Sequence, residues 1–145
     1  MRTLEEIRKG PLRLYSFVNY YLSDLQRGLQ TAHLVSELYM KYRFSSSRVT
    51  FILDAWAYMN KTIIILNGGN QKNLSDILHQ FQKAGLNYPY TMFQEDDDSL
   101  NNALTCVGII FPEFTKQDVE DYVDVADGTD DFIDLMRLIR SYPLA

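Results

Sequence analysis

Residues 61–70 read KTIIILNGGN, and this stretch decides the fold class. The β-branched run from Lys61 to Leu66 is typical of a strand that is covered on both faces. Asn67-Gly68-Gly69-Asn70 then predicts a turn. Residues 73–84 follow with apolar side chains at helical spacing, and Gly85 is typical of a helix end. A strand, a turn and an amphipathic helix in this order indicate an α/β domain.

On the N-terminal side, residues 12–20 predict a second strand, rich in Leu, Tyr, Phe and Val, which we place at the centre of the sheet. Ser23 or Asp24 is expected to cap a helix that runs to about Tyr42. A shorter amphipathic helix is expected over 49–59 after a serine-rich break. The apolar face expected on the long helix comprises Leu25, Leu29, Ala32, Leu34, Val35, Leu38 and Tyr39.

On the C-terminal side, residues 87–94 and 103–111 predict two more strands, separated by an acidic loop at 95–102. The alternation of strands and helices predicts a three-layer α/β domain. We expect a small mixed four-stranded sheet with helices on both faces. This domain would span residues 1–112, of which residues 1–11 form a charged lead-in.

Residues 113–145 are expected to form an acidic helical extension that packs on the domain or on a partner. Thr115 and Asp118 predict a capping box, and Asp130 or Asp131 starts a last helix. That helix would carry a wide apolar surface, so we expect self-association through it. The surface comprises Phe132, Ile133, Leu135, Met136, Leu138 and Ile139.

Cysteine use and hydropathy limit the class of protein. The 145 residues contain a single cysteine, Cys106, which can form neither an internal disulfide nor a zinc site. No apolar run is long enough to span a membrane, and no secretory signal opens the chain. Gly68-Gly69 lacks the Lys-Ser/Thr ending of a phosphate-binding loop. We therefore expect a cytoplasmic protein without a metal or cofactor.

The charge is divided unevenly along the chain. Residues 1–83 carry eleven Lys and Arg against six Asp and Glu, whereas residues 84–145 carry three against thirteen. A basic half favours nucleic acid only if its charges form one surface. The alternative is that both sets are ordinary solvated surface.

Three polar residues of the long helix lie on adjoining turns of one side. Gln26, Gln30 and His33 are separated by four and three residues. They are candidates for a functional site. The alternative for His33 is a helix histidine that packs against the sheet.

The segments FVNYYLS at 17–23 and QTAH at 30–33, with Gln26 between them, resemble the first strand and helix of the type 2 peptidyl-tRNA hydrolase family. The family pattern there is V-R-x-D-L-x-M-S-x-G-K-x-A-A-Q-x-x-H-A. The element order is similar over about residues 12–112, including Gly-Leu-Asn-Tyr at 85–88. The resemblance implies the same fold and a site that acts on the ester between a peptide and tRNA.

The resemblance also places the family's functional positions in this sequence. Gln30 and His33 are kept. The family lysine falls on Gln26, the loop aspartate on Glu95 and the loop threonine on Ser99. The family aspartate after the first strand falls on Asn19, and the loop glycine on Asp97. Loss of the lysine removes a positive charge that would stabilise an oxyanion or phosphate.

Two functions follow from these residues. In the first, the site is degraded or repurposed, and the chain is a binding module for a protein or a small molecule. One version is an inhibitor whose acidic half imitates nucleic-acid phosphate. In the second, the chain is an esterase on peptidyl-tRNA or aminoacyl-tRNA, with Glu95 as base, Ser99 as hydroxyl donor or nucleophile, and His33 and Gln30 orienting the substrate. Binding of tRNA would require one basic patch formed by Arg8, Lys9, Arg13, Arg27, Lys41, Arg43 and Arg48.

Overall fold

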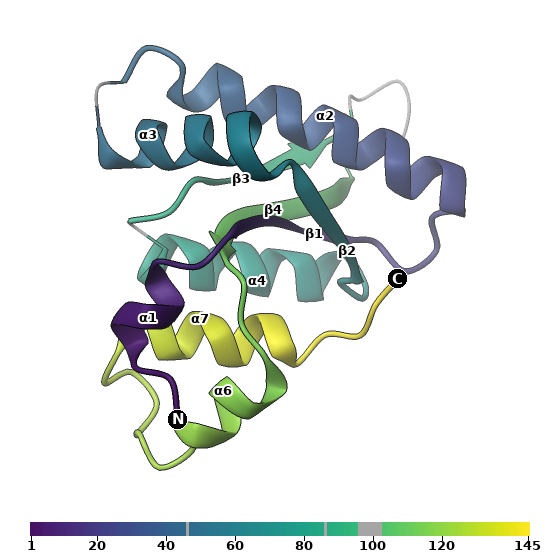
Figure 1. Ribbon diagram of the computed structural model, residues 1–145. Coiled ribbons are helices and arrows are strands. Elements are labelled where there is room, and N and C mark those ends of the chain that lie inside the picture. Colours follow the sequence, from purple (N-terminus) through teal and green to yellow (C-terminus); the bar gives the residue numbers. More distant parts are fainter. Residues whose placement is uncertain (46, 86, 96–102) are drawn as a thin grey trace.

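The computed structural model describes residues 1–45, 47–85, 87–95 and 103–145 (Figure 1). Strands and helices alternate along most of the chain, as the sequence predicts. In chain order the elements are α1 (Leu4–Arg8), β1 (Leu12–Val18), α2 (Asp24–Tyr42), α3 (Arg48–Ala55), the π-helical turn η1 (Trp56–Asn60), β2 (Thr62–Asn67), α4 (Gln71–Ala84), β3 (Tyr90–Gln94), β4 (Leu104–Pro112), α6 (Lys116–Asp121) and α7 (Asp131–Arg140).

One mixed four-stranded sheet forms the middle layer, in the order β2-β1-β4-β3. β1 pairs with β2 in parallel and with β4 antiparallel, and β3 pairs with β4 antiparallel. The central position expected for β1 is confirmed. The connection from β1 to the parallel β2 passes through α2 and α3, because parallel neighbours need a crossover.

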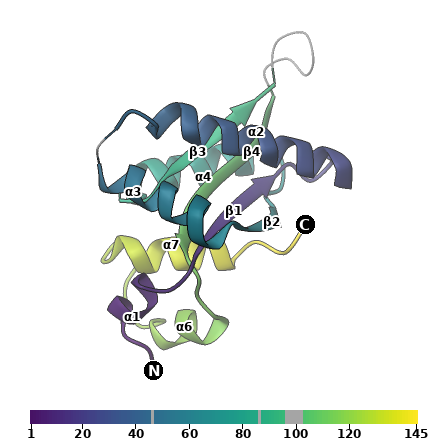
Figure 2. The same ribbon diagram turned by 45° about the horizontal axis from the view of Figure 1, so that its top comes forward.

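Helices cover both faces of this sheet, with α2 and α3 on one side and α4 and α7 on the other (Figures 1 and 2). Successive residues of β1 show both contacts. Ser16 Oγ lies 2.8 Å from Thr31 Oγ1 of α2, whereas the Phe17 ring meets Phe81 of α4 edge-on. Gly108 of β4 allows α2 to approach, since a Cβ there would lie 2.4 Å from the Leu34 side chain. The predicted α/β class is confirmed.

The prediction that the strand at 61–66 is covered on both faces is wrong. β2 is an edge strand, and the Ile63 side chain is 43% exposed. A short segment at the C-terminus covers part of its outer edge. Asn67 N donates to Pro143 O (2.8 Å), and Ala145 N donates to Ile65 O (3.0 Å). A β-branched run reports strand propensity, but it does not distinguish an edge from a centre.

The expected apolar face of α2 is only partly buried. Leu34 and Leu38 face the sheet as predicted, but Gln30 and Thr31 are buried beside them. Leu25 and Leu29 are exposed instead. The helix therefore has a polar N-terminal half toward the sheet and apolar residues toward solvent.

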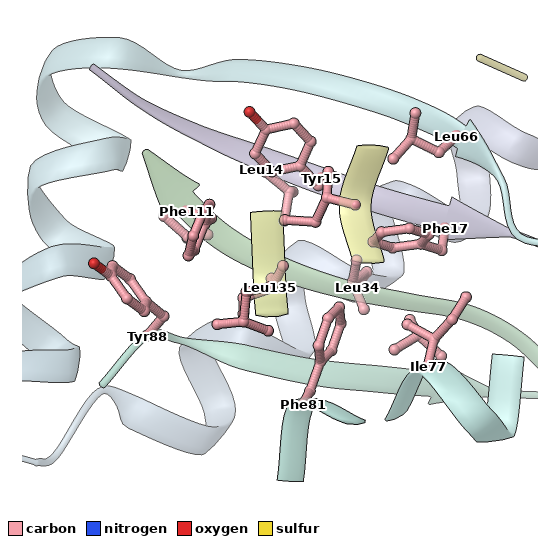
Figure 3. Packing of buried hydrophobic residues seen from close by; sticks show 14 of the residues in the cluster. Leu14, Tyr15, Phe17, Leu34, Leu66, Ile77, Phe81, Tyr88, Phe111 and Leu135 are labelled. Carbon is pink, nitrogen blue, oxygen red and sulfur yellow. The ribbon is translucent and has the colours of Figure 1, made fainter. Parts of the chain in front are cut away.

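The last helix contributes to the main core rather than standing apart from it. The rings of Phe132 in α7 and Phe111 in β4 are stacked, with centroids 4.7 Å apart. Figure 3 shows Leu135 of α7 together with Phe111 and Phe81. The apolar residues that suggested self-association through this helix thus lie in the chain's own core, where Phe132, Ile133, Leu135, Met136 and Ile139 are buried.

Within the part of the chain that the structure describes, no helix combines the length and the apolar character needed to cross a membrane.

Candidate functional site

Two candidate residues that are 65 positions apart meet in the structure. Gln30 lies on the sheet side of α2, and Glu95 follows the last residue of β3. Gln30 Nε2 donates to Glu95 Oε1 over 2.6 Å, a short and charge-assisted hydrogen bond. Glu95 is also held through its backbone, since its N–H donates to Ala103 O (3.0 Å).

Two buried amide atoms in this region have no hydrogen-bond partner among the described residues: Gln30 Oε1 and Asn19 Nδ2. Asn19 is fully buried just after β1, and its backbone N–H donates to Thr105 O (3.0 Å). Burying an unpaired polar atom costs about 1–3 kcal/mol unless a water or a ligand pairs with it. The acceptor Gln30 Oε1 and the donor Asn19 Nδ2 are therefore available to a bound water or ligand.

Gln26 is not part of this arrangement. Its side-chain Oε1 accepts a hydrogen bond from Ser23 N (3.0 Å), and its own N–H donates to Ser23 Oγ (3.2 Å). These two bonds form a capping box at the start of α2. The position that the resemblance assigns to the family lysine thus holds a helix cap here.

His33 packs on the neighbouring strand. Its ring stacks on Phe93 of β3, with centroids 4.6 Å apart and planes inclined by 14°. The residue is exposed on its other side. Its position fits the alternative of a histidine that packs against the sheet. The Phe93 ring that it contacts lies in β3, two residues before Glu95.

Ser99, the remaining candidate, lies outside the described residues, as do the three aspartates that follow Glu95. Among the residues that the structure does describe, no group of three or more His, Cys, Asp or Glu side chains is placed to hold a metal ion.

A buried polar cluster that the sequence does not signal lies under α2. Ser16 Oγ contacts Cys106 Sγ at 3.1 Å as well as Thr31. Burial raises the pKa of the Cys106 thiol to about 12, although hydrogen bonds with Ser16 and Thr31 act in the opposite direction. The thiol is neutral at physiological pH, so Cys106 is a core residue and not a nucleophile.

The basic residues named as a tRNA surface are distributed over several elements. Arg13 lies at the start of β1 and Arg27 in the second turn of α2, at opposite ends of the sheet. Four of the seven contact carboxylates within 4.0 Å, in the pairs Arg8–Asp130, Lys9–Glu5, Arg13–Glu113 and Arg27–Asp24. Arg8 and Arg48 line one surface hollow, whereas Arg27 lies near the start of the chain's first long helix, so the seven residues do not all lie on one element.

Two surface hollows lie away from Gln30 and Glu95. They have volumes of about 450 and 660 Å³ and adjoin where the end of α4 meets the start of α7. Asp131 lines both, and Arg8 and Arg48 line the larger one. None of the four described candidates, Gln26, Gln30, His33 and Glu95, lines either hollow.

The sequence matches no model of a known protein family, and it has no significant match among curated proteins. The resemblance to the type 2 peptidyl-tRNA hydrolases therefore rests on the quoted motifs and on the order of the elements.

Proposed function

We propose that the protein is a non-catalytic, protein-binding module on a fold like that of the type 2 peptidyl-tRNA hydrolases. One observation carries this proposal: exposed large apolar side chains are concentrated between the end of β1 and the start of β2. Ten of the thirteen in the described chain lie between residues 20 and 63. They are Tyr20, Tyr21, Leu25, Leu29, Met40, Phe44, Phe51, Tyr58, Met59 and Ile63.

The outer side of α3 and η1 provides the clearest binding surface of this kind. Phe51, Tyr58 and Met59 are each more than 70% exposed. Tyr58 and Met59 follow Phe51 by seven and eight residues, which places all three on one side of the helical segment. The buried Leu53 and Trp56 lie on the opposite side. Aromatic residues and methionine are enriched in protein interfaces, and contiguous apolar patches on a soluble chain mark interaction sites.

The contacts of the candidate catalytic groups support a binding role. Gln26 caps a helix, and Gln30 is bonded to Glu95. No positive charge takes the place of the family lysine at position 26. An ester hydrolase needs a group that stabilises the developing oxyanion, and a capping glutamine does not supply one.

The contacts of the acidic C-terminal half give less support to the alternative of an inhibitor that imitates nucleic-acid phosphate. Asp127 bonds to Arg137, and Asp130 accepts hydrogen bonds from Phe132 N and Ile133 N. Asp118 pairs with Arg2. Because these carboxylates already have partners within the chain, we favour the apolar surface of α3 and η1.

The proposed binding surface is tested by partner capture from an extract of the source cells. The double variant Phe51→Glu, Tyr58→Glu should lose captured protein, because charge on both sides of the patch must be desolvated on binding. Lys72→Glu is the matched control on α4, an exposed site on the other side of the sheet. Equal capture by all three proteins would contradict a protein-binding surface at this position.

The absence of catalysis is tested with a model peptidyl-tRNA. We expect no turnover above the buffer rate at a high concentration of the wild-type protein. Turnover at a rate proportional to protein concentration would show that the chain is an enzyme and would overturn the non-catalytic proposal.

An esterase is the second candidate, and the unpaired Gln30 Oε1 and Asn19 Nδ2 favour it. They lie in the region of Glu95, and a substrate could supply the missing donor and acceptor. In this case the Glu95→Ala, Ser99→Ala double variant should lose the turnover, whereas Gln117→Ala on α6 should keep it. Turnover that the double variant keeps would point to a contaminating hydrolase.

A further inference from the structure

Separate segments of the chain line the larger of the two hollows beside α7. Arg8 ends α1, Arg48 begins α3, Tyr88 lies between α4 and β3, and Asp131 begins α7. Phe132 adds an apolar wall. The volume of about 660 Å³ lies within the range of about 300–1,000 Å³ that is usual for small-molecule sites. The hollow thus has the size of a ligand site and a few polar groups that meet in it.

The Tyr88 hydroxyl is one group in this hollow without a partner. The side chain is only 8% exposed, and its ring packs 4.9 Å from Phe111 and 6.2 Å from Phe132, measured between centroids. In Figure 3 its oxygen points away from Leu135. The hydroxyl has no hydrogen-bond partner among the described residues, although the side chain lines the hollow. A tyrosine buried to this extent normally has such a partner, so the hydroxyl is available to a ligand.

Two side chains of opposite charge in the hollow are also unpaired. Within the described chain, neither Arg48 nor Asp131 has an oppositely charged group within 4.0 Å, and they do not reach each other. The other two charges are partly satisfied, since Arg8 lies 4.0 Å from Asp130, and Asp130 accepts two hydrogen bonds from the backbone of α7. A ligand between Arg48 and Asp131 therefore meets one free positive and one free negative group.

We propose that this hollow binds a small zwitterion, a molecule with one anionic and one cationic group, such as an amino acid or a short peptide. Its anionic group accepts hydrogen bonds from the Arg48 guanidinium and the Tyr88 hydroxyl. Its cationic group pairs with the Asp131 carboxylate. Hydrogen bonds to charged groups are stronger than those between neutral groups. The inference goes beyond the protein-binding surface proposed for α3 and η1 and does not depend on it.

The charges that line the hollow favour a zwitterion over a simple anion. Arg8 and Arg48 share the lining with two aspartates, Asp130 and Asp131. A phosphate group with two negative charges would be attracted by the arginines but repelled by both carboxylates. A ligand whose own charges sum to zero is complementary to this lining.

The electrostatic surroundings of Tyr88 suit a hydrogen-bond donor. Burial raises the pKa of its hydroxyl, and the positive charges of Arg8 and Arg48 act in the opposite direction. The pKa stays above its usual value, so the hydroxyl keeps its proton at neutral pH. It can therefore donate to an anionic group of the ligand.

An NMR titration of the full, isotope-labelled chain with alanine, dialanine and trialanine tests the site. Each added residue moves the ammonium group away from the carboxylate by up to about 3.5 Å, so the probes span a range of charge separations. We expect at least one probe to shift the backbone amide signals of Arg48, Tyr88 and Asp131 together and saturably. The probe with the highest affinity distinguishes a free amino acid from a peptide. No saturable shift of these signals with any probe at several millimolar would overturn the proposal.

Blocking one end of the best probe separates the contributions of the two charges. Acetylation of the amino group removes the cation, and amidation of the carboxyl group removes the anion. Each change should weaken binding about tenfold, because each removes a hydrogen bond between charged groups. If the acetylated probe bound as tightly as the free one, the hollow would be a site for a simple anion and the proposal would be wrong.

Substitutions in the hollow give an independent test. Arg48→Gln and Asp131→Asn should each weaken binding of the best probe about tenfold, and Tyr88→Phe, which removes only the hydroxyl, should weaken it severalfold. Arg43→Gln and Asp124→Asn are the matched controls, because they remove the same charges at exposed positions that do not line the hollow. The controls should bind like wild type; equal affinity of all five variants would contradict a site between Arg48 and Asp131.

Discussion

Asp118 is the residue that joins the acidic C-terminal segment to the N-terminus. Its carboxylate, almost fully buried, pairs with Arg2 and accepts a hydrogen bond from Thr115 N (2.8 Å). Tyr122 Oη adds a hydrogen bond to Arg2 O (2.7 Å). Burial alone would raise the pKa of Asp118, but the hydrogen bonds from Arg2 and Thr115 outweigh it and hold the pKa below its usual value.

This pKa gives a prediction for stability against pH. A carboxylate whose pKa is lower in the folded state stabilises the fold fully above its unfolded pKa of about 3.9, and this contribution is lost as the pH falls through the folded value. We expect Asp118→Asn to lower the free energy of unfolding by about 1–2 kcal/mol at pH 7, a modest figure because Arg2 is 42% exposed.

Urea unfolding at pH 7 and at pH 3 measures this effect. The difference between wild type and Asp118→Asn should shrink at pH 3, whereas the exposed Asp124→Asn should match wild type at both values. A constant difference at the two pH values would show that the ionised carboxylate is not the cause.

At the scale of a single element, α2 combines several roles. Its first turn is capped by Ser23 and Gln26, its inner side carries Gln30, and its outer side carries the exposed Leu25 and Leu29. The spacing that made Gln26, Gln30 and His33 candidates is helical, as predicted. Only Gln30 is joined to Glu95, because the three side chains point to different neighbours: the helix start, the end of β3 and the Phe93 ring.

The role of Gln26 gives the second prediction. Gln26→Ala should lower the free energy of unfolding by about 0.5–1 kcal/mol, since the capping box loses the hydrogen bond to Ser23 N. Gln26→Glu is the control that keeps the acceptor and also suits the helix dipole, so it should be as stable as wild type. Thermal or urea unfolding measures both, and an unchanged Gln26→Ala would exclude the capping role.

At the scale of the whole molecule, α7 completes the core on the α4 side of the sheet. Phe132 packs against Phe111 and Tyr88, and Tyr142 beyond the helix meets Phe17 of the central strand edge-on. Pro143 to Ala145 then join the outer edge of β2. The segment after residue 112 is therefore packed into the same core as the sheet.

Truncation tests this dependence. A chain that ends at Glu113 should lose cooperative unfolding, because removal of α7 exposes the core surface around Phe111. The milder variant Met136→Ala should lower the free energy of unfolding by about 2–5 kcal/mol, as expected for a fully buried methionine. Cooperative urea unfolding of the truncated chain at wild-type stability would show that the helix is dispensable.

The strands and helices could be predicted from the sequence, because strand and helix periodicities and caps act over a few neighbouring residues. The strand at Leu12–Val18, the helix ending at Tyr42 and the capping box of Thr115 and Asp118 were all predictable in this way. The α/β class, with a mixed sheet between helices, could be predicted from the order of the strands and helices along the chain.

Which side of each element is buried depends on the packing of the whole chain and could not be predicted. The position of β2 at an edge, the exposure of Leu25 and Leu29, and the pairing of Gln30 with Glu95 depend on chain segments that are distant in sequence. The same apolar pattern fits a core or an interface, since the hydrophobic effect has no direction. A side of a helix or strand is buried only when the other layers pack against it, so burial cannot be deduced from one element alone.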